Sequence, residues 1–212
     1  GEAAPFAPVT GETADGCAEV LGMFRTGLIG MNPLEIEKIH QMMDGVVHGN
    51  GSAKCAVDIA LYDIMGKVME QPLYRVLGGW QNVVQNDVTI GIGDPEKMAQ
   101  AAGRYVHEQG YRILKIKAGI DPAEDIRALT LIRQAVGPNV RLRVDANQGY
   151  TVSKAIYALE EMKKLGIEAV EQCLPDWDLE GARELKEKVS GIQLMLDESI
   201  HTVKDAARAA KM

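Results

Sequence analysis

The sequence has few aromatic residues and few cysteines, and both shortages narrow the classes of protein that fit it. Aromatic residues make up 5% of the 212 residues, while glycine occurs 22 times, a composition typical of a chain with many short turns. The cysteines Cys17, Cys55 and Cys173 are odd in number and far apart. Their spacing argues against a disulfide framework and a zinc knuckle, so we expect a reducing, cytoplasmic location.

Long apolar runs and an excess of basic charge are also missing. No stretch approaches the roughly 20 apolar residues that a membrane-spanning helix needs, and no basic-then-apolar signal opens the chain. The net charge is −7, whereas a surface that binds nucleic acid is basic. We therefore expect no membrane and no nucleic-acid partner. Hydrophobic residues at 46% and charged residues at 25% indicate an ordinary globular protein.

The residue pattern changes near residue 80, which predicts two domains, 1–80 and 81–212. The first part contains helical stretches at 18–26, 33–43 and 52–69, followed by LGGW at 77–80, which interrupts the pattern. After residue 82, short apolar runs alternate with amphipathic helices. The predicted strands are 88–92, 113–117, 142–145, 169–171 and 194–197.

Capping residues mark the helices of the second part. The residues suited to helix N-caps are Asp94, Asp121, Thr151 and Thr202. The glycines that follow helical patterns, where a left-handed residue commonly ends a helix, are Gly110, Gly137, Gly166 and Gly191. Five strand–helix units in series predict an α/β fold with a parallel sheet, either a barrel or an open doubly wound sheet.

Charged residues recur at the ends of four predicted strands. The second strand ends with Lys115 and Lys117, and the next three end with Asp145, Glu171 and Asp197. The two intervals between successive carboxylates are both 26 residues. Because side chains alternate along a strand, the two lysines share one face, and the apolar residues between them must face the helices. We expect the charged groups to meet at the C-terminal rim of the sheet, where barrel enzymes build active sites.

This combination of groups predicts a particular chemistry. Three converging carboxylates repel one another, and a divalent cation removes that cost. Ligands that are all oxygen favour Mg²⁺, with Mn²⁺ as the alternative, and disfavour zinc. Two ammonium groups two residues apart lower each other's pKa, which predicts a lysine able to act as a general base. A base beside such a metal indicates removal of the proton alpha to a substrate carboxylate, with the metal stabilising the enediolate.

Each feature alone has a simpler explanation. A single aspartate at a strand end is most often a helix cap or a loop anchor, and a single KxK is usually a solvated strand edge. Regular spacing of three carboxylates, together with a lysine pair on the same face, favours the functional interpretation.

Four short motifs carry a family resemblance: KIK at 115–117, DANQ at 145–148, VEQ at 170–172 and DES at 197–199. With them, the chain resembles the enolase superfamily, in particular its muconate-lactonizing-enzyme subgroup. Residues 52–79 resemble the last helices of that family's capping domain, and residues 1–13 resemble the segment that enters it. The resemblance implies a partial (β/α) TIM-type barrel, about five of eight units, preceded by the helical part of an α+β capping domain.

The resemblance also implies roles for individual residues. Asp145, Glu171 and Asp197 would hold Mg²⁺, Lys117 would be the acid/base catalyst, and Lys115 would tune it. The residues implied to surround the metal or bind substrate are Asn147, Thr89 and Glu198. The implied substrate is a small carboxylate. Racemisation or epimerisation of an amino-acid derivative or dipeptide is the first expectation, with cycloisomerisation and dehydration as alternatives that share the same first step.

The chain departs from the family pattern in its extent. A full barrel has eight strand–helix units, and five are predicted here, so we expect a chain truncated at both ends. The family's second catalytic lysine, on the sixth strand, and its eighth-strand specificity residues would lie beyond Met212. A catalytically silent fragment is therefore a second hypothesis. For the complete protein we expect a homo-oligomer.

Overall fold

A computed structural model describes residues 1–211 of the chain. The chain forms two compact units, Gly1–Val84 and Gln85–Met212. Each unit has its own cluster of buried hydrophobic residues. Within residues 1–211, no helix is both long enough and apolar enough to cross a membrane.

The first unit is helical. Its core lies where α2, α3 and α4 meet, around the buried side chains of Phe24, Ile39 and Met43. The predicted helix at 33–43 begins three residues later, because Asn32 accepts a hydrogen bond from the backbone of Leu34 and forms a turn first. The helices are α1 (Ala7–Thr10), α2 (Ala14–Leu28), α3 (Ile36–Val46), α4 (Gly51–Val68) and α5 (Leu73–Val76).

The second unit alternates strands and helices. All neighbouring strands are parallel, and the strand order is β1-β2-β3-β4-β5. The strands are β1 (Val88–Ile90), β2 (Ile113–Lys117), β3 (Arg141–Asp145), β4 (Ile167–Glu171) and β5 (Gln193–Met195). The helices are α6 (Pro95–His107), α7 (Pro122–Val136), α8 (Val152–Lys164), α9 (Leu179–Lys188) and α10 (Val203–Ala209).

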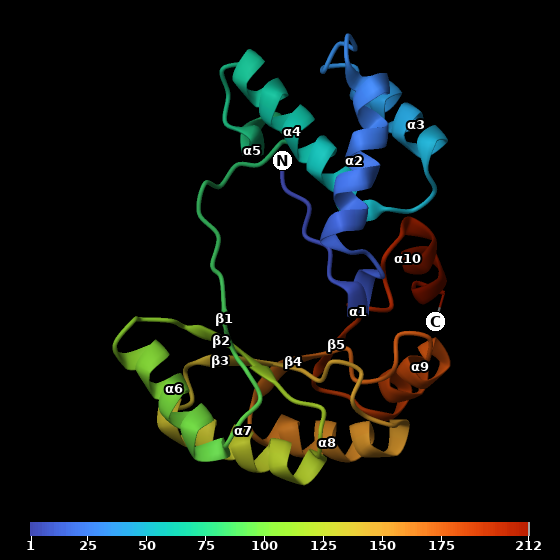
Figure 1. Ribbon diagram of the computed structural model, residues 1–212. Coiled ribbons are helices and arrows are strands. Elements are labelled where there is room, and N and C mark those ends of the chain that lie inside the picture. Colours follow the sequence, from blue (N-terminus) through green and yellow to red (C-terminus); the bar gives the residue numbers. More distant parts are fainter. Residues whose placement is uncertain (212) are drawn as a thin grey trace. The chain divides into compact units, whose positions relative to one another are not determined.

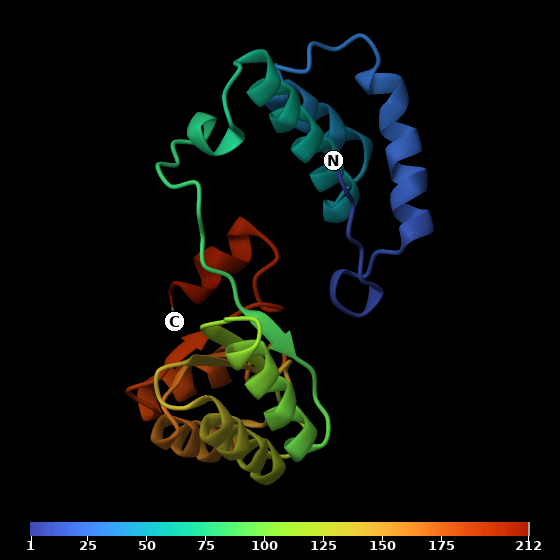
Figure 2. The ribbon, with the colours of Figure 1, turned by 90° about the vertical axis from the view of Figure 1, so that its left-hand side faces the viewer.

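The strand order decides between the two predicted sheet types. In a doubly wound sheet the strand order reverses at a switch point and helices cover both faces. Here every connection moves one strand in the same direction, and α6, α7 and α8 lie on one side of the sheet (Figures 1 and 2). The second unit is therefore part of a (β/α) barrel, with five strand–helix units in the described chain.

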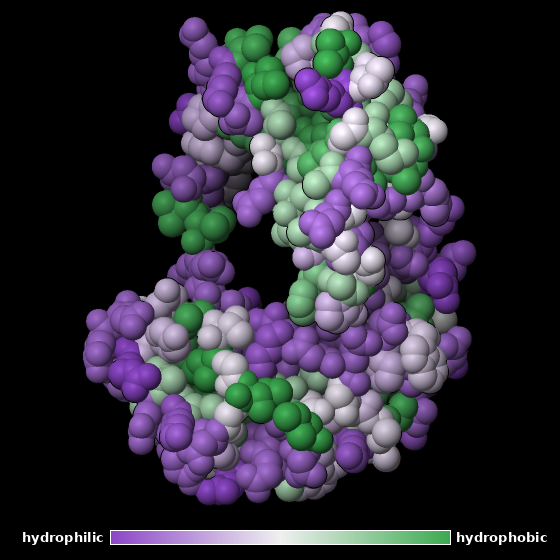
Figure 3. All heavy atoms as spheres, in the orientation of Figure 1, coloured by the Kyte–Doolittle hydropathy of each residue, from purple (hydrophilic) through white to green (hydrophobic). Residues whose placement is uncertain are grey.

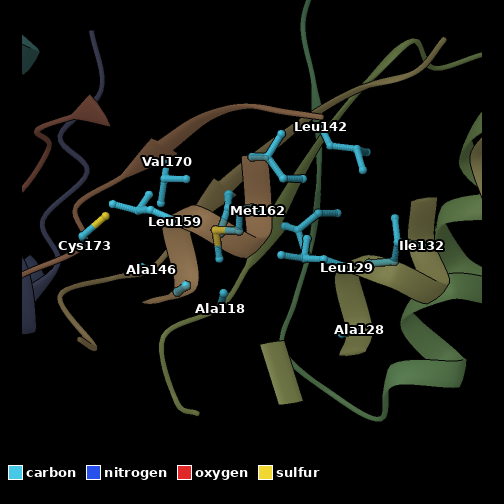
Figure 4. Packing of buried hydrophobic residues seen from close by; sticks show 14 of the residues in the cluster. Ala118, Ala128, Leu129, Ile132, Leu142, Ala146, Leu159, Met162, Val170 and Cys173 are labelled. Atoms are coloured by element: carbon cyan, nitrogen blue, oxygen red, sulfur yellow. The ribbon is translucent and has the colours of Figure 1, made fainter. Parts of the chain in front are cut away.

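The core of the second unit lies between the outer face of the sheet and the helices. Leu142 and Val170 of the strands lie beside Leu129 of α7 and Leu159 and Met162 of α8 (Figure 4). All five side chains are fully buried. Burial of a large aliphatic side chain stabilises the fold by roughly 1.5–3 kcal/mol. The apolar strand residues face the helices as predicted, which leaves the opposite face to the charged residues.

The predicted caps are confirmed. Each of the four N-cap side chains accepts a hydrogen bond from a backbone N–H of the first helical turn; these residues are Asp94, Asp121, Thr151 and Thr202. Capping of this kind contributes about 1 kcal/mol per helix. The caps fix where each helix starts, and so fix the short loops that follow the strands.

Candidate active site

The C-terminal ends of β2, β3 and β4 place three predicted site residues side by side. Lys117 is the register partner of Asp145, and Asp145 is the register partner of Glu171. Residues in register on parallel strands point to the same face of the sheet, and Lys115 shares that face two residues earlier. Hydrophilic residues gather over this part of the sheet (Figure 3). The structure thus brings four of the predicted site residues together.

Ion pairs connect these four side chains. The Lys115 ammonium lies 2.8 Å from a Glu171 carboxylate oxygen and 3.0 Å from an Asp145 carboxylate oxygen. The Lys117 ammonium lies 2.8 Å from the same Asp145 oxygen. Asp145 is 1% exposed and Glu171 6% exposed. Two buried carboxylates are therefore balanced by two lysines, one of which bridges them.

Burial and pairing act against each other on the ionisable groups. Burial opposes ionisation of Asp145, but hydrogen bonds from Lys117 and Lys115 outweigh it and lower its pKa. For Glu171, burial and the nearby Asp145 charge raise the pKa despite the hydrogen bond from Lys115. Burial also opposes the charged form of Lys115, yet its bonds to Glu171 and Asp145 raise its pKa. The predicted lowering of the pKa by the lysine pair is thus wrong for Lys115. Direct hydrogen bonds to two carboxylates favour its charged form and raise its pKa.

Backbone hydrogen bonds continue the sheet beyond the strand ends. The residue that follows a strand donates its N–H to the carbonyl that ends the next strand, and this happens three times. The three bonds are Ala118 to Asp145 at 2.8 Å, Ala146 to Glu171 at 3.0 Å and Gln172 to Met195 at 2.9 Å. This pattern holds the strand ends, and so the side chains they carry, in a fixed array.

The loops after β2 and β3 pack directly on each other. A side chain at Gly149 would place its Cβ 1.8 Å from the carbonyl oxygen of Gly119, so only glycine allows this approach. The buried carboxylate of Asp125 accepts hydrogen bonds from the Gly119 N–H at 3.0 Å and from the Tyr150 hydroxyl at 2.7 Å. These contacts connect the loop that follows Lys117 to the loop that follows Asp145.

The third predicted carboxylate, that of Asp197, lies in a loop and not at the end of a strand. The fifth strand ends at Met195 instead of the predicted Asp197, and Asp197 lies in the following loop with an exposed side chain. Its backbone N–H donates to the side-chain oxygen of Gln172 at 2.8 Å rather than to a neighbouring strand. Within residues 1–211, no group of three or more His, Cys, Asp or Glu side chains is already arranged to hold a metal ion.

The remaining predicted residues surround the rim. Asn147 follows β3 with a positive φ of 42°; its N–H donates to Asp145 at 3.0 Å and its side chain donates to Glu198 at 3.3 Å. Glu198 is buried, and its second carboxylate oxygen has no hydrogen-bond partner within residues 1–211. Thr89 is exposed on β1, in register with Lys115.

The donor atoms of the predicted metal ligands, all of them oxygen, have the chemistry that suits a hard divalent cation. Asp145 and Glu171 end neighbouring strands, and Asp197 lies two residues past the end of the next strand. Within residues 1–211, the buried Glu198 leaves one carboxylate oxygen without a donor. A buried acceptor without a partner is costly, and a cation or a water held by a cation satisfies it. Oxygen donors alone are the ligand set that Mg²⁺ prefers.

An ionic network that was not predicted from the sequence lies below the rim. Arg143 pairs with Glu168 at 3.2 Å and with Asp87 at 3.4 Å, and Arg141 also pairs with Glu168. The alternation of RLRVD places Arg141, Arg143 and Asp145 on one face, and this signal was available in the sequence. The position of Glu168 depends on a register shift between β3 and β4, which the sequence does not reveal.

Family models match both parts of the chain. Residues 97–212 match the model described as "Enolase C-terminal domain-like", which is more than half of the chain. Residues 4–78 match the model described as "Mandelate racemase / muconate lactonizing enzyme, N-terminal domain".

Two curated relatives and one solved structure are similar over the whole chain. A hydrophobic dipeptide epimerase of Enterococcus faecalis is 42% identical, covering 100% of this chain and 59% of the relative. An L-Ala-D/L-Glu epimerase of Clostridium acetobutylicum is 41% identical, covering 100% of this chain and 60% of the relative. The crystal structure of a dipeptide epimerase from Enterococcus faecalis, complexed with Mg and the dipeptide L-Leu-L-Tyr, superposes with a TM-score of 0.96 at 41% identity. That match covers 99% of this chain and 58% of the other. The chain thus spans about three fifths of the length of these relatives.

Proposed function

The chain belongs to the mandelate racemase/muconate lactonizing enzyme family of the enolase superfamily, and we propose that the protein is a Mg²⁺-dependent dipeptide epimerase. The observation that carries this proposal is the pairing of Lys117 with Asp145, beside Glu171, at the ends of three neighbouring strands. In the proposed function, such an array would put an acid/base group next to the substrate carboxylate. The relatives at 41–42% identity are dipeptide epimerases, which favours a dipeptide over the substrates of a cycloisomerase or a dehydratase.

In this proposal, the residues of the chain divide the chemistry between them. Mg²⁺, held by Asp145, Glu171 and Asp197, would supply positive charge beside the substrate carboxylate. Lys117 exchanges a proton with the alpha carbon of the C-terminal residue, the carbon bonded to the C-terminal carboxylate of the dipeptide. The electron pair left behind is delocalised into that carboxylate. Lys115 keeps both buried carboxylates paired and adds positive charge below the substrate.

The test is exchange of the alpha proton in D₂O. We expect the intact protein with Mg²⁺ to incorporate deuterium at the C-terminal alpha carbon of L-Leu-L-Tyr or L-Ala-L-Glu and to form the epimer, as followed by NMR. Asp145→Asn should slow this exchange at least about 100-fold, because it removes a charge that holds the cation. Asp94→Asn is the matched control, since asparagine caps α6 as well as aspartate does. Turnover of a lactone or a dehydration substrate, with no exchange in any dipeptide, would contradict the proposal.

A further inference from the structure

Gln172, directly after β4, has an unfavourable position by two measures. Its backbone φ is 39°, in the left-handed region that residues with a Cβ usually avoid. The residue is 2% exposed. A side-chain amide buried without hydrogen-bond partners destabilises the fold by about 1–3 kcal/mol. A residue held in this way needs strong local contacts, and its side chain makes them.

The side-chain amide of Gln172 uses its full hydrogen-bonding capacity. Its NH₂ group donates to the Leu174 carbonyl at 2.9 Å and to the Ser199 hydroxyl at 2.8 Å. Its oxygen accepts from the N–H of Asp197 at 2.8 Å and from the N–H of Ser199 at 3.2 Å. Two donors and two acceptor positions are all that an amide offers. Three of the four bonds go to the loop that follows β5.

The backbone of Gln172 joins the neighbouring strand ends as well. Its N–H donates to Met195, the last residue of β5, and its carbonyl accepts from Gln148 of the loop after β3 at 2.7 Å. The ladder between β4 and β5 stops at Met195. Beyond that residue, the Gln172 amide supplies the hydrogen bonds that a neighbouring strand would otherwise supply to the backbone of residues 197 and 199.

We propose that Gln172 is the positioning residue for Asp197: its amide fixes the loop backbone from which that carboxylate projects, and thereby sets the affinity for Mg²⁺. This inference rests on the proposed function, in which Asp197 is a metal ligand. Asp145 and Glu171 end strands inside the sheet and need no such support. Asp197 lies two residues past its strand, so its placement depends on the loop. Groups that orient a metal ligand typically contribute 10- to 100-fold in affinity.

The experiment shortens the side chain of Gln172 by one carbon and keeps its amide group. Gln172→Asn keeps the functional group and suits a positive φ, but withdraws the amide by one C–C bond, about 1.5 Å. Gln148→Asn is the matched control: Gln148 also has a positive φ, of 67°, and its amide oxygen accepts from Asp176 rather than from the loop at 197–199. Amide hydrogen exchange is measured without Mg²⁺ in the intact protein, and Mg²⁺ affinity by titration calorimetry.

We expect Gln172→Asn to speed exchange at the N–H groups of residues 197 and 199 about tenfold or more and to weaken Mg²⁺ binding about 10- to 100-fold. Gln148→Asn should leave both within about twofold, and strand amides at 114–116 and 142–144 should stay protected in both variants. If Gln172→Asn fails to fold, Ser199→Ala removes one partner of the amide and should change both quantities about threefold.

The inference is overturned if Gln172→Asn binds Mg²⁺ as tightly as the parent does, even if the loop amides exchange faster. In that case the loop backbone would not set the Mg²⁺ affinity through Asp197. Failure of the metal assignment in the proposed function gives a different result. In that case the parent protein binds no Mg²⁺, or Asp197→Asn binds it as tightly as the parent does.

Discussion

The side chains of Asp125 and Tyr150 meet inside the second unit, beside the loop that follows Lys117. Burial raises the pKa of Asp125, and the hydrogen bonds from Tyr150 and Gly119 act in the opposite direction. Burial and the bond to Asp125 raise the pKa of Tyr150, so this hydroxyl stays protonated and remains a donor. A single pair of side chains thus holds two of the loops that shape the rim.

Tyr150→Phe should destabilise the protein by about 1–3 kcal/mol at neutral pH, because it leaves a buried carboxylate short of a donor. The deficit should depend on pH. A group whose pKa is raised on folding contributes most at low pH, and loses that contribution as the pH rises through its folded-state pKa. Loss of the Tyr150 hydroxyl should raise the pKa of Asp125 further, so the deficit should grow as the pH rises above the ordinary carboxyl range, about pH 4. Urea unfolding of both proteins over a series of pH values above this range measures it; a deficit that shrinks with rising pH would contradict the role of Asp125.

At the scale of strands and loops, sequence patterns predicted the strand bounds that depend on local interactions alone. The bounds of β2 follow from the alternation of ILKIK, and the structure has the same strand, Ile113–Lys117. The end of β5 was predicted two residues too late, because the Gln172 side chain, distant in sequence, binds the backbone at residue 197. The pairing of Arg143 with Glu168 likewise depends on a register shift that involves two strands. Local spacing cannot reveal either.

Close packing of the loops after β2 and β3 predicts opposite effects for two glycine substitutions. Gly149→Ala should destabilise the protein by about 1–3 kcal/mol or more, because its Cβ would overlap the Gly119 carbonyl, a backbone atom that cannot move aside cheaply. Gly103→Ala, inside α6, meets only the edge of His107 at 4.0 Å and should stabilise the protein by about 0.5–1 kcal/mol. Thermal unfolding of the two variants compares them directly. Equal effects would mean that the loops are not held together as described.

At the scale of the whole molecule, the two faces of the sheet in the second unit differ in chemical character. Its outer face packs on the helices through apolar residues, and its inner face carries ion pairs from the rim at Lys117 down to Arg141. The α/β class and the five units were predictable, since each strand–helix unit has its own local pattern. The choice of a barrel over a doubly wound sheet required the strand order, because both fold types share the same local patterns.

In the proposed function, Lys117 exchanges the alpha proton and Lys115 does not. Both share one face, but Lys117 is two residues closer to the rim, about 6–7 Å further along the strand. Epimerisation requires acid/base groups on both faces of the alpha carbon, and in the proposed function Lys117 would serve one of them. The decisive measurement is solvent-deuterium exchange with each epimer of the dipeptide, in Lys117→Ala and Lys115→Ala variants of the intact protein. We predict that Lys117→Ala abolishes exchange from one epimer while exchange from the other survives. Two results would contradict this role of Lys117. One is exchange of both epimers at the parental rate in Lys117→Ala. The other is loss of exchange from only one epimer in Lys115→Ala.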